Sequence, residues 1–139
     1  MLHLLAYTSA SVGFLEPTIL DAILEVSQVN NKRDGITGIL MYNDRLFFQI
    51  LEGRRSLVED CYTRICIDNR HKSTCLMYSQ RVEVRVFSGW GMRYVGPEEI
   101  GRYEKSLFQD IYYLMNTPKI TTGMALRLLK GVGKVFPYT

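Results

Sequence analysis

The stretch ITGILMYNDRLFFQIL, residues 36–51, decides the fold. Residues 36–42 form a short apolar run with β-branched and aromatic side chains, and residues 46–51 form a second such run. The polar pair Asn43-Asp44 between them is typical of a tight turn. The sequence therefore predicts a β-hairpin over this stretch.

A predicted helix lies on either side of this hairpin. Upstream, Pro17 stands where the first turn of a helix tolerates proline, apolar residues follow at helical spacing, and Gly35 ends the element. Downstream, Ser56 and Glu59 match a capping box, which predicts a second helix that reaches about residue 67. We therefore expect the order helix, hairpin, helix in the middle of the domain.

Extended segments complete the pattern at residues 2–8, near 74–86 and at 91–95. The resulting order predicts an α+β fold, a ferredoxin-like β-α-β-β-α-β sandwich with a fifth strand and both helices on one face of the sheet. Residues 97–139 are expected to form two C-terminal helices that cover the other face. We therefore expect one compact unit, with a core domain at 1–96 and this helical extension.

Composition limits the class of protein. A chain of 139 residues with 47% hydrophobic and 22% charged residues suits one globular domain. The net charge of +3 comes from scattered Lys and Arg, which argues against direct contact with nucleic acid. No apolar run reaches the roughly 18–20 residues of a membrane span. The three cysteines are odd in number and lack C-x-x-C spacing, so we expect a cytoplasmic protein without disulfides or zinc.

Two polar residues are placed among apolar neighbours. Gln49 lies in the strand 46–51, where both faces are otherwise apolar, and a buried amide without partners costs about 1–3 kcal/mol. Tyr7 ends the first predicted strand, and a buried phenol also needs a partner. Either residue could be purely structural. Neighbouring strands could bring them together, but the sequence does not decide this.

Both predicted helices end in polar residues after an apolar face, which contains Ile23 in the first and Ile65 in the second. Each polar group has an ordinary explanation as a helix cap or a solvated surface charge. Taken together, two such helices could hold a flat heterocycle such as a flavin, a pterin or a purine, because amides both donate and accept hydrogen bonds. The polar residues are Ser27, Asn30, Asn31, Arg64, Asp68, Arg70 and His71.

Five segments, taken in order, resemble the BLUF family of blue-light sensors that use flavin. The resemblance covers about the first 95 residues. It implies a photoreceptor, not an enzyme, with noncovalently bound FAD. The matching segments are LAYTS at 5–9, NNKRDGITGIL at 30–40, FFQILEG at 47–53, DNRH at 68–71 and FSGWGM at 87–92.

The resemblance also implies roles for single residues. Tyr7 would be the electron donor, and Gln49 would lie between it and the flavin ring. Trp90 and Met92 would sense Gln49, but Gly91 replaces a serine that is frequent in the family, so which of the two faces the flavin stays open. The ring and the ribityl and phosphate groups would be bound by Ile23, Ser27, Asn30, Asn31, Arg64, Ile65, Asp68, Arg70, His71 and Met92.

The output and two alternatives remain open. Residues 97–139 are too short for a catalytic effector, so the chain resembles short stand-alone members that signal through self-assembly or a separate protein. We expect a homo-oligomer built through the tail helices and a downstream signalling partner. The alternatives are a small flavin-dependent oxidoreductase and a light-insensitive ferredoxin-like binding module. Neither a nicotinamide fingerprint nor a nucleophile-and-base grouping in the sequence supports the first alternative.

Overall fold

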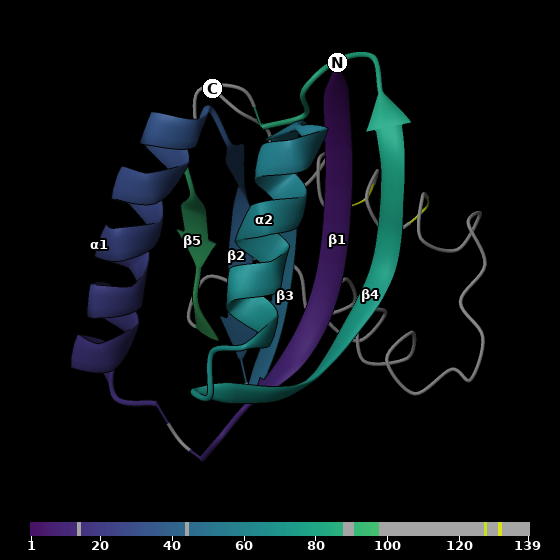
Figure 1. Ribbon diagram of the computed structural model, residues 1–139. Coiled ribbons are helices and arrows are strands. Elements are labelled where there is room, and N and C mark those ends of the chain that lie inside the picture. The colour runs from purple at the N-terminus through teal and green to yellow at the C-terminus, as the bar shows by residue number, and fades with distance from the viewer. Residues whose placement is uncertain (14, 44, 88–90, 98–126, 128–130, 132–139) are drawn as a thin grey trace.

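The computed structural model describes residues 1–13, 15–43, 45–87, 91–97, 127 and 131. This part of the chain contains five strands and two helices (Figure 1). In chain order they are β1 (Leu2–Ser11), α1 (Pro17–Asp34), β2 (Thr37–Asn43), β3 (Leu46–Arg54), α2 (Arg55–Cys66), β4 (His71–Val82) and β5 (Arg93–Val95).

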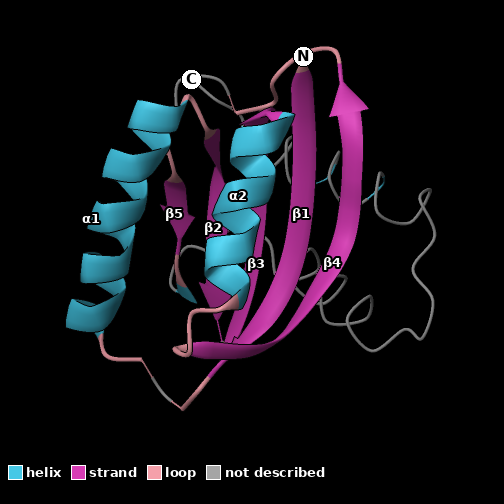
Figure 2. Cartoon of the chain, in the orientation of Figure 1, coloured by secondary structure: helices cyan, strands magenta, loops and turns pink. Residues whose placement is uncertain are grey.

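The strands form one mixed sheet in the order β4-β1-β3-β2-β5. β5 runs parallel to β2, and the other neighbours are antiparallel. Both helices lie on the same face of the sheet (Figure 2). This arrangement confirms the predicted ferredoxin-like fold with a fifth strand. The two predicted C-terminal helices, and most of the proposed extension 97–139, lie outside the described residues.

The predicted hairpin consists of β2 and β3. β2 starts and ends one residue later than expected, so Asn43, which was expected in the turn, belongs to the strand and pairs with Leu46. β3 starts at Leu46 as expected but continues to Arg54. Gly38 is required where the two strands approach each other, because a Cβ at this position would lie 1.9 Å from the carbonyl oxygen of Ile50. Gly35 ends α1 in the left-handed region, with φ of 66°. The glycines of this stretch thus determine how closely the hairpin packs and where α1 ends.

The predicted capping box at the start of α2 is wrong. The helix begins at Arg55 immediately after β3, its cap residue Arg54 makes no side-chain capping bond, and Ser56 already lies inside the first turn. Glu59 instead accepts a hydrogen bond from Arg55 Nε at 2.8 Å, one helical turn away. The boundaries of the last strands also differ, since β4 starts at His71 and β5 has only three residues.

The central strands β1 and β3 are buried on both faces of the sheet. On the helix side, Leu5 and Leu51 belong to the core cluster that includes Val58 of α2. On the other side, Ile39 and Phe48 are fully buried. Because side chains alternate along a strand, Tyr7 and Gln49 lie on the helix side. In the described part of the chain, no helix is both long and apolar enough to cross a membrane.

Candidate functional site

Tyr7 and Gln49 face each other across β1 and β3, where they are direct partners in the strand register. Both are buried, with 3% and 5% of their surface exposed, and the Tyr7 hydroxyl donates a hydrogen bond to Gln49 Oε1. The sequence left this contact open, because the two residues lie 42 positions apart. The pairing of β1 with β3 brings them together.

Burial determines the state of the Tyr7 phenol. It raises the pKa of this group well above the ordinary value, so the hydroxyl stays protonated at neutral pH and acts as a donor. The ring of Tyr62, on α2, packs against the Tyr7 ring with centroids 5.3 Å apart. Tyr7 is thus held by a ring contact on one side and by Gln49 at its tip.

Gln49 continues the chain of contacts to Met92. Its Nε2 donates to Met92 Sδ at 3.4 Å, and Met92 is 4% exposed. A thioether sulfur is a weak acceptor, so this bond is easily given up. Met92 therefore lies at Gln49 in this structure. Trp90, the other candidate, lies outside the described residues.

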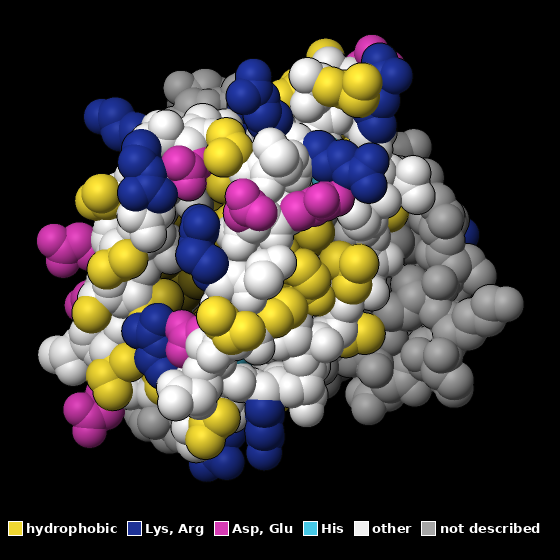
Figure 3. Space-filling model, viewed as in Figure 1, with side chains coloured by type: hydrophobic (Ala, Val, Ile, Leu, Met, Phe, Trp, Pro, Cys, Tyr) yellow, Lys and Arg dark blue, Asp and Glu magenta, His cyan; other side chains and the backbone are white. Residues whose placement is uncertain are grey.

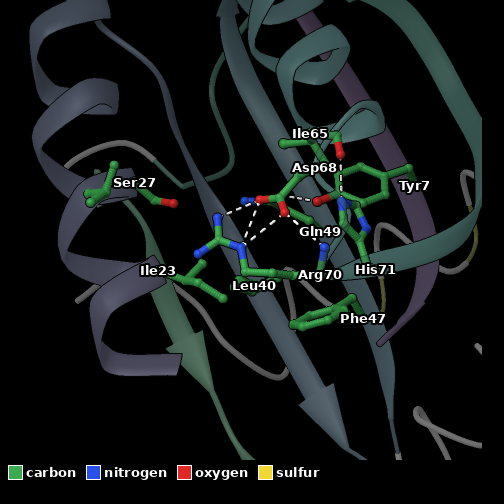
Figure 4. Close-up of a pocket in the computed structure, with 11 residues that line it drawn as sticks. Tyr7, Ile23, Ser27, Leu40, Phe47, Gln49, Ile65, Asp68, Arg70 and His71 are labelled. Atoms are coloured by element: carbon green, nitrogen blue, oxygen red, sulfur yellow. Dashed lines mark hydrogen bonds and ion pairs between the residues drawn. The ribbon is translucent and has the colours of Figure 1, made fainter. Parts of the chain in front are cut away.

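The gap between α1 and α2 contains two adjoining cavities, of about 150 and 200 Å³. Figure 4 shows Ile23 and Ser27 of α1 on one side of the first cavity and Tyr7, Gln49 and His71 on the other. Ser27 and Gln49 line both cavities, which are therefore parts of one site. Except for Met92, every residue expected to bind flavin lines one or both cavities: Tyr7, Ile23, Ser27, Asn30, Asn31, Gln49, Arg64, Ile65, Asp68, Arg70 and His71.

Four residues that line the cavities were not expected from the sequence: Val26, Leu40, Phe47 and Cys61. Leu40 is the register partner of Gln49 in the observed hairpin, but the predicted turn at Asn43-Asp44 gives a different register and would not have paired the two. Phe47 lies on the same strand face as Gln49, because residues two positions apart in a strand share a face. Val26 and Cys61 gave no signal: Cys61 looks like an ordinary core position, and Val26 is a largely exposed residue of α1. Their contribution to the cavities depends on how the helices pack.

An ion pair provides the charged part of the site. Arg70 Nε lies 2.9 and 3.0 Å from the two carboxylate oxygens of Asp68, and the Arg70 backbone N–H also donates to Asp68. This hydrogen bonding lowers the pKa of the Asp68 carboxyl. Arg64 of α2 reaches Asp34 of α1 at 3.8 Å. The space-filling view shows basic side chains around the hollow between the two helices (Figure 3).

His71 is held by the protein through both ring nitrogens. Nε2 contacts the backbone carbonyl of Ile65, which can only accept, so Nε2 carries the proton. Nδ1 lies 2.8 Å from the Ser9 hydroxyl, which donates to it in the neutral ring. His71 therefore joins the start of β4 to the end of α2 and offers the cavity a ring edge instead of a free nitrogen.

The lining residues fit a flavin ring. Ile23 and Ile65 present apolar side chains from opposite helices, as a flat aromatic ligand requires. Asn31 is 3% exposed, and in the described part of the chain its amide makes one hydrogen bond, from Nδ2 to Gly91 O at 2.9 Å. Gln49 likewise has one amide hydrogen beyond its two bonds. These amides can meet the alternating carbonyl and N–H groups at a flavin edge.

Known proteins resemble this chain in sequence and structure. The family model described as "BLUF: Sensors of blue-light using FAD" matches residues 2–93. Photoactivated adenylate cyclase subunit beta of Euglena gracilis is 29% identical over 94 residues, which cover 66% of this chain and 11% of that protein. The blue light- and temperature-regulated antirepressor BluF of Escherichia coli (strain K12) is 32% identical over 73 residues, 52% of this chain and 18% of that protein.

The chain therefore spans less than a fifth of the length of these two relatives. Among solved structures, the dark state of BlrB, a BLUF protein, matches over 97% of both chains with a TM-score of 0.77 and 28% identity. The family match covers β1 through the start of β5 and thus both helices that enclose the cavity. This chain belongs to the BLUF family, the sensors of blue light that use FAD.

Proposed function

We propose that this blue-light sensor switches through a chain of three buried residues, Tyr7, Gln49 and Met92. The observation that carries the proposal is the pair of hydrogen bonds from Tyr7 to Gln49 and from Gln49 to Met92 at the edge of the α1–α2 cavity. Each bond can change without unfolding its surroundings, because the strands that carry Tyr7 and Gln49 are central in the sheet.

FAD, when bound, absorbs blue light and in its excited state accepts an electron. Ile23 and Ile65 would flank its ring, and the amides of Asn30 and Asn31 with the Ser27 hydroxyl would bind its polar edge. Arg64 and Arg70, the latter oriented by Asp68, and the ring of His71 would line the more polar part of the site. These assignments rest on the cavity lining and on the chemistry of each side chain.

Tyr7 would supply both the electron and a proton. Its burial keeps the phenol neutral, so the electron leaves a protonated group whose hydrogen already points at Gln49 Oε1. Loss of the electron makes the phenol a strong acid, and the proton moves along this existing bond. When electron and proton return, Tyr7 is neutral again, and no substrate is consumed.

Gln49 would store the change. A carboxamide has a donor end and an acceptor end, and rotation exchanges them. A rotated Gln49 turns its oxygen toward Met92, while a tautomerised Gln49 has a single hydrogen left on Nε2. Rotation breaks the bond to the Met92 sulfur, because the amide oxygen has no hydrogen to donate, and tautomerisation leaves Nε2 with one hydrogen instead of two for this bond and for the ligand.

We also propose that the output passes to a second copy of this chain or to a separate signalling protein. The named relatives join a similar segment to much longer sequences, one an adenylate cyclase subunit and one an antirepressor. Light scattering in the dark and under blue light tests self-assembly, with more than one copy expected. A monomer in both states would rule out the homo-oligomer and leave the separate partner.

The expected cytoplasmic location stays a prediction.

The switch is tested by absorption spectra of FAD-loaded protein in the dark, under blue light and during recovery. Wild type should show a small, reversible redshift, and Tyr7→Phe should bind FAD without it. Tyr62→Phe is the matched control, because Tyr62 contacts Tyr7 by its ring and makes no hydrogen bond to Gln49. A normal redshift in Tyr7→Phe would refute the proposed switch.

A further inference from the structure

Two side chains of α1 hold the backbone around Met92. Gln28 Nε2 donates to the carbonyl oxygen of Met92 at 3.3 Å, and Asn31 Nδ2 donates to that of Gly91 at 2.9 Å. Gln28 and Asn31 lie three residues apart, so they occupy neighbouring positions on the helix. Figure 1 shows α1 beside β5, the strand that Met92 precedes.

The sheet gives Met92 little support, because the residue lies directly before the short strand β5. The ladder between β2 and β5 begins with the pair Ile39–Arg93, so Met92 lies just before the first paired residue of β5. β5 has three residues, and within the described part of the chain it pairs with β2 alone and forms the edge of the sheet. The backbone of Met92 is therefore held from one side by a short ladder and from the other by α1.

Gly91 increases this need. Glycine leaves the backbone before Met92 with more freedom than any other residue would. Space does not require glycine here, since a Cβ on Gly91 would lie 3.7 Å from the backbone oxygen of Gln28, an ordinary contact. Residue 91 therefore lacks a side chain that would restrict its backbone, although the structure has room for a Cβ atom there.

We propose that Gln28 is a positioning residue of the switch. Its amide fixes the backbone of Met92, offsets the freedom of Gly91 and so keeps the Met92 sulfur against Gln49 in the dark. Gln28 itself lines neither cavity, so it acts only through Met92. The inference rests on the proposed function, because it takes Gln49 as the residue that switches.

The test follows the Met92 methyl group by NMR in FAD-loaded protein labelled with methyl-13C methionine and kept in the dark. The Met92→Leu variant identifies its signal among the six methionines. Gln28→Leu should shift the population of Met92 toward a second signal by about fivefold, the effect of losing one ordinary hydrogen bond. Gln28→Glu, which keeps the shape and removes the donor, should act in the same direction.

Two controls complete the design. Gln80→Leu makes the same change at an exposed glutamine on β4 and should leave the Met92 signal as in wild type. Adding Gly91→Ala to Gln28→Leu should move the signal back toward wild type, because alanine restricts the backbone. FAD content and the redshift are measured on each Gln28 and Gln80 variant and should stay unchanged, since Tyr7, Gln49 and Met92 are intact.

The outcomes are separable. An unchanged Met92 signal in both Gln28 variants, with a normal wild-type redshift, would overturn the positioning role and leave the proposed function standing. Absence of a redshift in wild type would overturn the proposed function, while the dark NMR signals would still report on the contact with Gln28. Failure of Gly91→Ala to restore the signal would refute the compensation for glycine.

Discussion

Glu52 is a fully buried carboxylate on the sheet face opposite the cavity, and replacing it with glutamine should destabilise the domain. Its Oε1 accepts from the Thr37 hydroxyl at 3.1 Å and from the Phe87 N–H at 2.9 Å, and its Oε2 accepts from the Val86 N–H. Glu52 thus fastens the segment after β4 to the end of β3.

The size of the effect follows from these bonds. Glutamine keeps the shape, but only one of its two terminal atoms can accept a hydrogen bond. With its oxygen at the Oε1 position, the bonds from Thr37 and Phe87 remain, and its NH2 group then faces the Val86 N–H. Loss of one bond to a charged group costs about 1.5–3 kcal/mol, and the opposed donor adds to this, so we expect Glu52→Gln to lower the free energy of unfolding by about 2–4 kcal/mol.

Urea unfolding followed by circular dichroism, at one saturating FAD concentration for every variant, measures this difference. Glu59→Gln is the matched control, because Glu59 is an exposed carboxylate on α2 and its loss should leave the midpoint nearly unchanged. The redshift should survive in Glu52→Gln, since the residue points away from the cavity. A change in unfolding free energy below about 0.5 kcal/mol would refute the reasoning, because such values are typical of surface substitutions.

Three further changes test other parts of the site. Gly38→Ala should greatly reduce bound FAD, measured as the ratio of flavin to protein absorbance, because the new Cβ would collide with the backbone of β3; full FAD occupancy would contradict this. Asp68→Asn should reduce stability by its full amount above the ordinary carboxyl pKa of about 3.9 and by less and less below it. The hydrogen bond from Arg70 lowers the pKa of Asp68, so the stability that this ion pair contributes is lost as the pH falls through the lowered value. Urea unfolding of wild type and Asp68→Asn at several pH values measures this loss. A difference between the two proteins that does not change with pH would refute the prediction. Met92→Leu should keep FAD and the redshift but slow dark recovery by up to about fivefold, because the dark state loses one hydrogen bond, and an unchanged recovery rate would exclude this role.

The parts of the fold that were predicted correctly depend on local chemistry. The apolar runs at 36–42 and 46–51 and the helix stop at Gly35 can be recognised within a few residues of sequence. The predicted capping box is wrong because β3 continues to Arg54 and α2 begins at Arg55. Ser56 therefore lies inside the helix and does not have the extended conformation of a cap residue. Local signals were therefore sufficient for the type of each element that the structure describes, while the end of β3 was decided by its pairing with β1.

For the site, the residue types were visible in the sequence and their partners were not. Gln49 stood out as an amide in an apolar strand, but its bond to Tyr7 depends on the register between β1 and β3. Gln28 gave no signal, because it lies off the apolar stripe of its helix and its partner is 64 positions away. Such contacts follow from how strands and helices pack.

The sequence by itself determined the order of strands and helices, the polar groups that had to find partners, and the resemblance to a family of light sensors. Only the tertiary structure decided which atoms meet: the Tyr7–Gln49 bond, the contact of Gln49 with Met92 and the support of Met92 by α1. The physical reason is that periodicity and turn chemistry act over a few residues. A hydrogen bond between distant segments needs a register and a helix position that only the packed sheet provides.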